Sequence, residues 1–486
     1  MNSYINKLYP RGFLLTDIES PVFNNQLTEH VFKKWGKLKL GEYTLFFDAS
    51  TTNTYLQNGS YKIFIQGLVL NPFDNLASIN EIANKLLFKK MDSEVTFLDY
   101  LDQLSGRFVI ITQNKDLTEV YNDACGTRTV FYNDSPQTAA IASHSELIAD
   151  LLGYKHSKKS TALRKHPLFK KIRYLPGLYT PFDEVKPLTP NTKLLVEKRK
   201  VERIFPRSPI VETTSVDNLV DELVSLLKNQ VHLLAEHNKV SVSLTAGIDS
   251  RLTYAMFSDV RGDIDYFTHI NTDSTQSYIE DVRVAKELAR MGNSPYRLIE
   301  YKLDKEQEGL KDFTEIWLKN LGMNRGSLYL FKAYTDLFPE GRVHVRSNLA
   351  EIARTYYRKT SDNVNAKVLS RLYTKSELKN DPEIIKSFQE FIKVTGFKQE
   401  NLFNFDYADL FYWEHRMSLW HSYIVLESDM AYETYILYNN RALLTKMLSA
   451  PIEIRESNEL FIRMIQKAWP EVLDLPVNGE MLNTKV

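Results

Sequence analysis

The N-terminal third of the chain alternates apolar and polar residues with the two-residue period of β-strands. This pattern predicts strands over residues 41–48, 61–70, 106–112 and 118–121, and helices over residues 78–88 and 95–104. Asn58-Gly59 has the composition of a tight hairpin turn, and we expect it to connect the first two of these strands. The polar break at residues 114–116 predicts a second hairpin. Two β layers with a few helices would account for this α+β region.

Beyond residue 212, helical spacing alternates with short apolar runs. A helix is predicted over residues 216–237, because leucine and valine recur every three or four positions on one face. Strands follow at residues 240–244, 264–270 and 296–301 and from Arg342 onward, with a helix over residues 276–291. Strands and helices in this order predict a parallel, doubly wound α/β sheet, which binds ligands beyond the carboxyl ends of its strands. The remainder of the chain reads as additional helices.

The sequence KVSVSLTAGIDSR, residues 239–251, combines a buried strand, a turn of small residues and a helix start. Such a turn lets backbone N–H groups point at a phosphate, and the dipole of the following helix adds partial positive charge. The stretch lacks the Gly-Lys-Ser/Thr of a Walker loop and the GxGxxG of a dinucleotide site. A purely structural junction is the alternative, with Asp249 and Ser250 only capping free amides.

Composition narrows the function classes. The 486 residues are 43% hydrophobic and 25% charged, which suits a globular protein with two or three domains. Lys plus Arg equals Asp plus Glu at 61 each, so we expect neither nucleic acid nor another polyanion as a partner. No stretch approaches the roughly 20 apolar residues of a membrane span, and no leader is evident, so we expect a cytoplasmic protein without membrane contact. The single Cys125 excludes a disulfide framework.

The turn resembles the Ser-Gly-Gly-x-Asp-Ser pyrophosphate loop of the asparagine synthetase family of ATP pyrophosphatases. Thr245 stands for the serine, Ala246 and Gly247 stand for the glycines, and Asp249-Ser250 match directly. The resemblance implies an adenine nucleotide alpha hydrolase-like domain that uses ATP. It implies nucleotide and pyrophosphate contacts from Ser243, Thr245, Ala246, Gly247, Asp249, Ser250 and Ser347.

The strand from Arg342 leads into a second loop, which corresponds by order to the family's Ser-Gly-x-Gly-x-Asp-Glu loop. Ser347 matches the serine, and Glu351 is the carboxylate nearest to the Asp-Glu pair. The resemblance implies Mg²⁺ held by Asp249 and Glu351, and carboxylate oxygens on facing loops suit this ion. Glu351 also fits the role of an acidic residue at a helix N-terminus.

The N-terminal region resembles the class II glutamine amidotransferase domain of the same family, which has an Ntn-hydrolase-like fold. The matching segments are Leu104-Ser-Gly-Arg-Phe-Val-Ile-Ile and Asp123-x-x-Gly126-x-Arg128-x-x-x-Tyr132. That family uses an N-terminal cysteine nucleophile, whereas here Asn2 follows Met1. Cys125 fits a small buried hydrophobe far better than a nucleophile. We therefore expect no glutaminase activity.

Domain boundaries follow from these segments. We expect residues 1–153 to form the amidotransferase-like domain, 154–212 to form a connector and 213–486 to form the ATP-binding domain. Pro and Gly in the middle segment mark turns, which suits either a solvated connector or the interdomain hairpin of the family.

In the last region, the segment Trp413-Glu-His-Arg-Met-Ser-Leu-Trp-His-Ser422 resembles the family's Asp-Arg-x-Ser-Met-x-His-Ser segment. The resemblance implies that Glu414 and Arg416 line the acceptor side of the cleft, with Glu414 as the base for an attacking amine. An ion pair on a packed aromatic helix is the alternative for this segment. Tyr356-Tyr357 and residues 411–413 could stack a ring of the substrate, although a core role suits them better.

Together these features predict an ATP-dependent ligase that adenylates a small-molecule or peptide carboxylate and transfers it to ammonia or an amine. Two alternatives stay open. One is a degenerate nucleotide-binding or partner-binding member of the family, and the other is an RNA-modifying ATP pyrophosphatase. A homo-oligomer is compatible with the sequence.

Overall fold

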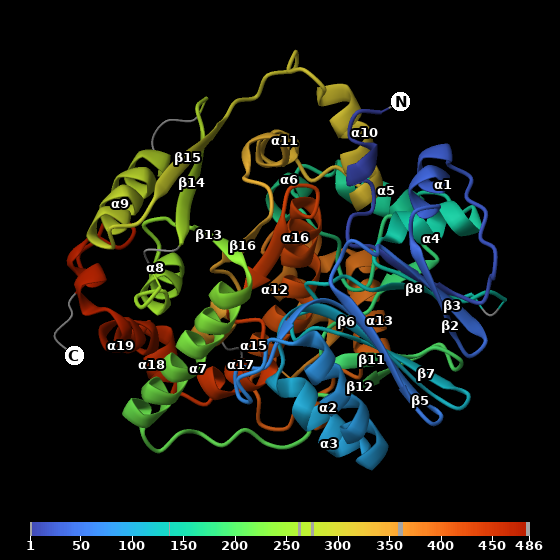
Figure 1. Cartoon of the computed structure of the whole chain (residues 1–486), viewed down its shortest axis with the longest axis horizontal. Helices are drawn as coiled ribbons and strands as arrows, with labels where there is room; N and C mark the ends of the chain where they lie inside the picture. The colour runs from blue at the N-terminus through green and yellow to red at the C-terminus, as the bar shows by residue number, and fades with distance from the viewer. Residues whose placement is uncertain (1, 136, 261–263, 274–276, 358–362, 483–486) are drawn as a thin grey trace.

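Two six-stranded antiparallel sheets form the N-terminal half of the computed structural model, which describes residues 2–135, 137–260, 264–273, 277–357 and 363–482 (Figure 1). The first sheet has the order β10 (Val185–Pro187), β8 (Phe131–Asn133), β9 (Ala140–Ala142), β1 (Phe13–Thr16), β3 (Tyr43–Phe47), β2 (Gly36–Leu40). The second has the order β12 (Lys200–Arg203), β11 (Thr192–Leu195), β7 (Leu117–Asn122), β6 (Ser105–Asn114), β5 (Tyr61–Leu70), β4 (Asn53–Asn58).

The two sheets pack face to face, with helices on both outer sides. Side chains along β5 point alternately to the two faces of its sheet, and both faces are covered. Phe64 packs into the core between the sheets, whereas Ile63 and Ile65 face the opposite side and contact α2 (Ile79–Asp92) and α3 (Glu94–Gln103). The far face of the first sheet packs against α4 (Ser145–Leu152). The expected β-layered domain is confirmed, and its layers follow the order helix–sheet–sheet–helix.

Two expectations about this half need correction. Asn58-Gly59 does form a hairpin turn, but it joins β4 to β5, and residues 43–47 belong to the other sheet. The strand at residues 53–58 escaped the pattern because its polar residues resemble a loop. Residues 154–212 are not merely a solvated connector, because β10, β11 and β12 extend both sheets. The same segment includes α5 (Lys158–Lys165) and α6 (Phe169–Ile172).

A five-stranded, wholly parallel sheet organises the C-terminal half. Its order is β15 (Tyr296–Tyr301), β14 (Asp265–Asn271), β13 (Lys239–Ser243), β16 (Arg342–Arg346), β17 (Glu433–Ile436). The chain builds outward from β13 to β15 and then returns to the other side of β13, so the strand order reverses between β13 and β16. Loops that leave neighbouring strands at such a switch point diverge and open a crevice. The predicted doubly wound sheet is therefore confirmed.

Several helices of this half match the helices that the sequence predicts. They include α7 (Val216–His237), α8 (Ile248–Met256), α9 (Ser277–Met291), α10 (Leu310–Leu321) and α11 (Leu328–Leu337). The helical region that follows comprises α12 (Ala366–Tyr373), α13 (Pro382–Thr395), α14 (Gln399–Leu402), α15 (Tyr407–Phe411), α16 (Ser422–Ser428), α17 (Arg441–Leu448), α18 (Ile452–Glu456) and α19 (Glu459–Ala468). Residue 276, the expected start of α9, lies outside the described residues. Short elements complete the chain: α1 (Gln26–Phe32) and the 3₁₀ turns η1 (Ile5–Lys7), η3 (Ala350–Arg354), η4 (Glu377–Asn380) and η6 (Pro470–Asp474).

A ten-residue π-helix, η5 (Tyr412–His421), connects α15 to α16. Wide π-helical turns are rare and frequently occur at functional sites, because they rotate the side chains that follow them. Glu414 and Arg416 both lie on this segment.

Buried polar contacts join the two halves. Arg107 of β6 forms a two-pronged ion pair with Asp429, which follows α16, and both side chains are almost fully buried. The amide of Asn439 donates to the Gly106 carbonyl at 2.6 Å, and Trp413 Nε1 donates to the Ala124 carbonyl at 2.8 Å. The segments that resemble amidotransferase motifs thus hold the two halves together. Within the described ranges, none of the helices has the length and apolarity that a membrane span requires.

Candidate functional site

The turn between β13 and α8 is folded by its own hydroxyl groups. Ser250 Oγ accepts the N–H of Thr245 at 3.2 Å and lies 2.9 Å from Thr245 Oγ1. Thr245 Oγ1 in turn accepts the N–H of Gly247 at 3.3 Å. Gly247 is the N-cap residue of α8 and has no side chain to cap it. The first amides of such a helix are available to an anion.

Two residues that the sequence analysis missed hold this turn in place. Asp281 of α9 accepts the N–H of Ala246 at 2.8 Å through Oδ1. Arg251 is fully buried, and its guanidinium donates to the carbonyls of Val472 at 3.0 Å and Pro476 at 2.7 Å. Burial lowers the pKa of Arg251 to about 10. Arg251 adjoins the motif and could have been suspected, whereas Asp281 carries no local signal.

Asp249 and Glu351 come together from the loops after β13 and β16. Burial, and next the Glu351 carboxylate, raise the pKa of Asp249 to about 7, and Arg354 opposes this rise. Arg354 Nη2 donates to Asp249 Oδ2 at 2.9 Å, and Asn348 Nδ2 donates to Glu351 Oε1 at 3.4 Å. The two carboxylates thus lie near enough to interact, because β13 and β16 are neighbours at the switch point.

Three oxygens at this place are buried and accept or donate no hydrogen bond to any described residue: Asp249 Oδ1, Glu351 Oε2 and Ser347 Oγ. Orphaned buried oxygens are costly, and two carboxylates near each other are costlier still. A divalent cation satisfies both needs, so the residues fit Mg²⁺. No three His, Cys, Asp or Glu side chains of the described residues form a complete metal cage. Mg²⁺ commonly takes one or two carboxylates from a protein and completes its shell with water and phosphate.

The expected general base requires correction. Glu414 has no exposed surface, and its carboxylate accepts two hydrogen bonds from Arg203, at 2.7 and 2.8 Å. Asn191 Nδ2 donates to the same carboxylate at 3.1 Å. This is the ion pair on a packed helix that the sequence left open. A base must present a free lone pair to the substrate, and Glu414 is enclosed by its partners instead.

Arg416, two residues further on η5, lies in a different environment. It is half-buried and surrounded by aromatic rings, with distances from its guanidinium carbon to the ring centroids of 4.8 Å for Trp420 and 4.9 Å for Tyr356. Tyr174 and Tyr412 complete the set at 5.8 and 5.9 Å. We call this group the aromatic cage. Phe411, Tyr412 and Trp413 are buried, as the core alternative for residues 411–413 holds, but Tyr356 is 53% exposed.

Cys125 is fully buried at the junction of the two halves. Its backbone N–H donates to Asn439 Oδ1 at 2.9 Å. Burial first, and then the Asp123 carboxylate, hold the pKa of the Cys125 thiol well above its ordinary value. A buried neutral thiol is a poor nucleophile, in agreement with the expectation that this residue packs as a small hydrophobe.

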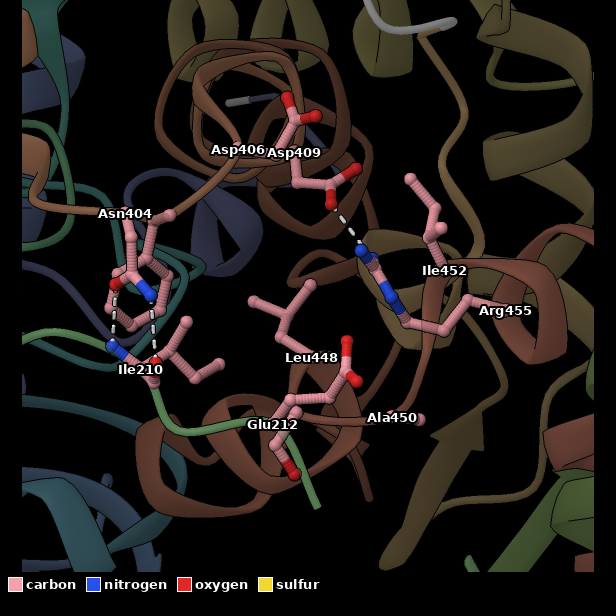
Figure 2. Close-up of a pocket in the computed structure, with 11 residues that line it drawn as sticks. Ile210, Glu212, Asn404, Asp406, Asp409, Leu448, Ala450, Ile452 and Arg455 are labelled. Carbon is pink, nitrogen blue, oxygen red and sulfur yellow. Dashed lines mark hydrogen bonds and ion pairs between the residues drawn. The ribbon is translucent and has the colours of Figure 1, made fainter. Parts of the chain in front are cut away.

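A separate cavity of about 240 Å³ opens between the loop after residue 209, α15 and the ends of α17 and α18 (Figure 2). The Asp409 to Arg455 ion pair, at 2.7 Å, spans one wall. The side-chain amide of Asn404 accepts the backbone N–H of Ile210 and donates to its carbonyl. None of its lining residues belongs to the loops after β13 and β16. The cavity is therefore distinct from the carboxylate pair.

Comparison with known proteins yields no matching family model and no matching curated protein. Similar solved structures include the glutamine-dependent NAD⁺ synthetase of Acinetobacter baumannii in complex with ADP, at 18% identity and a TM-score of 0.21, covering 37% of this chain and 34% of that one. Another is the NH₃-dependent NAD synthetase of Campylobacter jejuni, at 16% identity and a TM-score of 0.20, covering 38% and 96%. A third is the glutamine phosphoribosylpyrophosphate amidotransferase of B. subtilis complexed with ADP and GMP, at 12% identity and a TM-score of 0.25, covering 80% and 74%. The chain spans about a third of the length of the first. Similarities at this level carry no functional argument. The proposed function therefore rests on the residues of the site itself.

Proposed function

We propose that the chain is an ATP-dependent, amide-forming synthetase of the asparagine synthetase type. A carboxylate oxygen of the substrate attacks the α-phosphorus of ATP, and the bond to pyrophosphate breaks. A nitrogen nucleophile then attacks the acyl-adenylate carbonyl, AMP leaves, and the nitrogen loses a proton. The observation that carries the proposal is a pair of neighbouring carboxylates at the switch point of a parallel sheet, beside a helix N-terminus capped by a glycine. Each carboxylate has a buried oxygen without a hydrogen-bond partner among the described residues.

The chain's own residues would divide the work as follows. Asp249 and Glu351 would hold Mg²⁺, which when bound offsets the negative charge of the phosphates. The hydroxyls of Thr245 and Ser250 and the first amides of α8 would meet the charge that develops on pyrophosphate. The N–H of Ala246 already contacts Asp281 and so shapes the turn rather than binding the anion. Ser243, at the end of β13, and Ser347, after β16, would border the nucleotide.

The nitrogen source in this proposal is free ammonia or an amine of the substrate. The only thiol of the chain, Cys125, is buried and its pKa is raised, so it offers no nucleophile for releasing ammonia from glutamine. Glu414 is engaged by Arg203, and we assign it no part in the chemistry.

Nucleotide binding tests the proposal without knowledge of the carboxylate. Calorimetry would measure the binding of Mg²⁺ with the non-hydrolysable analogue AMP-PNP to the wild type, to Asp249→Ala and to Asp259→Ala. Asp259 is a matched control, because its carboxylate pairs with Lys228 on the surface, outside the site. We expect wild type and Asp259→Ala to bind alike, and Asp249→Ala to lose roughly tenfold or more in affinity.

Equal binding by all three proteins would refute the assignment of the site. Binding by the wild type without pyrophosphate exchange for any carboxylate would favour the alternative of a nucleotide-binding protein without chemistry. Circular dichroism of Asp249→Ala would show whether that variant keeps its fold.

A further inference from the structure

Arg416 forms no ion pair with a carboxylate of the described residues, and its Nε is buried without a hydrogen-bond partner among them. Burial opposes its charge, but the neighbouring tyrosines, first Tyr174 and then Tyr357, raise the pKa of Arg416 above its ordinary value. The guanidinium is therefore a fixed positive charge. The four surrounding rings offset part of this burial by cation–π attraction, while Nε has no acceptor among the described residues, so a ligand oxygen can complete it.

The aromatic cage lies near the carboxylate pair. Tyr356 follows Glu351 by five positions in the chain, and its ring centroid lies 4.6 Å from that of Tyr412. The Glu351 carboxylate raises the pKa of the Tyr412 hydroxyl, and the Arg416 guanidinium lowers it. Tyr356 is more than half exposed, and an exposed ring beside a cation can form the wall of a binding site.

We infer that the substrate of the proposed reaction is a planar aromatic carboxylic acid, whose carboxylate pairs with Arg416 and whose ring lies against Tyr356 and Trp420. This inference rests on the proposed function and adds its substrate class. A guanidinium recognises a carboxylate in its own plane through two parallel hydrogen bonds. When the carboxylate is conjugated to a ring, the ring lies in the plane of the carboxylate. One flat molecule can then accept both guanidinium hydrogen bonds and stack against the aromatic side chains.

Two other classes of acid fit less well. An α-amino acid would bring its ammonium group beside Arg416, where no carboxylate of the described residues balances a second positive charge. A saturated acid has the same charge but presents a puckered body of C–H groups, which loses the offset stacking that flat rings allow.

Direct binding to the full chain in the presence of Mg²⁺ and AMP-PNP tests the inference. The aromatic probes are benzoate, cinnamate and 2-naphthoate. Cyclohexanecarboxylate is the matched non-planar control for benzoate, and L-phenylalanine is the amino-acid control. The variants are Arg416→Gln, Arg416→Lys and Tyr356→Ala. Arg290→Gln is the arginine control on the surface of α9, where Arg290 pairs with Glu287. Pyrophosphate exchange with each acid is the second readout.

We expect at least one aromatic acid to bind roughly tenfold or more tightly than the two controls. Arg416→Gln should weaken that binding by roughly 10- to 100-fold, and Arg416→Lys should restore only part of it, because lysine lacks the planar fork. Tyr356→Ala should raise the KM for the aromatic acid in pyrophosphate exchange, while Arg290→Gln should change nothing.

Failure of all three aromatic probes to bind, or equal binding of benzoate and cyclohexanecarboxylate, would overturn the inference. So would unchanged binding in Arg416→Gln, which would make the cage a structural contact. AMP-PNP binding keeps this failure apart from failure of the proposed function. It should survive in Arg416→Gln and should be lost in Asp249→Ala, so a protein that binds AMP-PNP but no aromatic acid has the nucleotide site and another substrate class.

Discussion

Replacing Glu414 separates a structural ion pair from a catalytic base, because the two roles predict opposite outcomes. The carboxylate is fully buried, and Arg203, its partner, is only 9% exposed at the side chain. In Glu414→Gln, the Arg203 guanidinium still donates hydrogen bonds to the carbonyls of Thr395 at 3.0 Å and Phe205 at 2.8 Å. It no longer has a negatively charged partner. An uncompensated buried charge of this kind costs about 3–5 kcal/mol of folding free energy.

Urea unfolding, followed by far-ultraviolet circular dichroism, would measure this cost for Glu414→Gln, Arg203→Met and the double variant Arg203→Met/Glu414→Met. We expect each single change to shift the unfolding midpoint strongly to lower urea, and the double change to cost less than the sum, since it leaves no unpaired charge. Glu287→Gln, which removes an exposed ion pair with Arg290, should leave the midpoint unchanged. AMP-PNP binding per folded molecule should be the same in wild type and Glu414→Gln.

A different pattern would refute this reasoning. If Glu414→Gln kept the wild-type midpoint and instead abolished pyrophosphate exchange, the carboxylate would be part of the chemistry. If the double variant lost the full sum of the single effects, Arg203 and Glu414 would stabilise the fold independently rather than as a pair.

Three further predictions concern the N-terminal half. Burial raises the pKa of Glu146 from 4.5 to about 7, so the folded state binds the proton more tightly than the unfolded state does. The free energy of unfolding therefore falls as the pH rises between these two values. In urea unfolding at pH 8, Glu146→Gln should be more stable than the wild type by at most about 3 kcal/mol. At pH 4 the advantage should vanish, and an equal advantage at both pH values would contradict the assignment. Cys125 should resist a maleimide in the native protein and react once the chain is unfolded, as mass spectrometry would show; rapid native labelling would mean that the junction opens readily. Gly106→Ala should yield little folded protein, because Gly106 has φ +118° and an added Cβ would lie 2.2 Å from the Leu68 carbonyl oxygen; a soluble variant with the wild-type midpoint would disprove this.

The sequence was most informative where local spacing decides the structure. The heptad-like recurrence of leucines predicts α7, which spans Val216–His237, and short apolar runs predict β13, β14 and β15 nearly to the residue. The small-residue turn after β13 also follows from composition, because only small side chains leave backbone amides accessible. Strand order along the chain then implied a parallel sheet, and with it the meeting of Asp249 and Glu351 at the edge of that sheet.

The tertiary structure decided every feature that depends on a partner far away in the chain. Glu414 looked like a candidate base on its helix, and its role is set by Arg203, 211 positions earlier. The strand over residues 53–58 and those of the supposed connector are polar or short, so only their pairing with neighbouring strands makes them strands. Arg416 was predicted from a motif, but its aromatic surroundings come from the chain around Tyr174 and Tyr356. The hydrophobic periodicity of a helix or strand depends on residues close together in the sequence. Ion pairs, burial and the walls of a site form only when distant segments pack together.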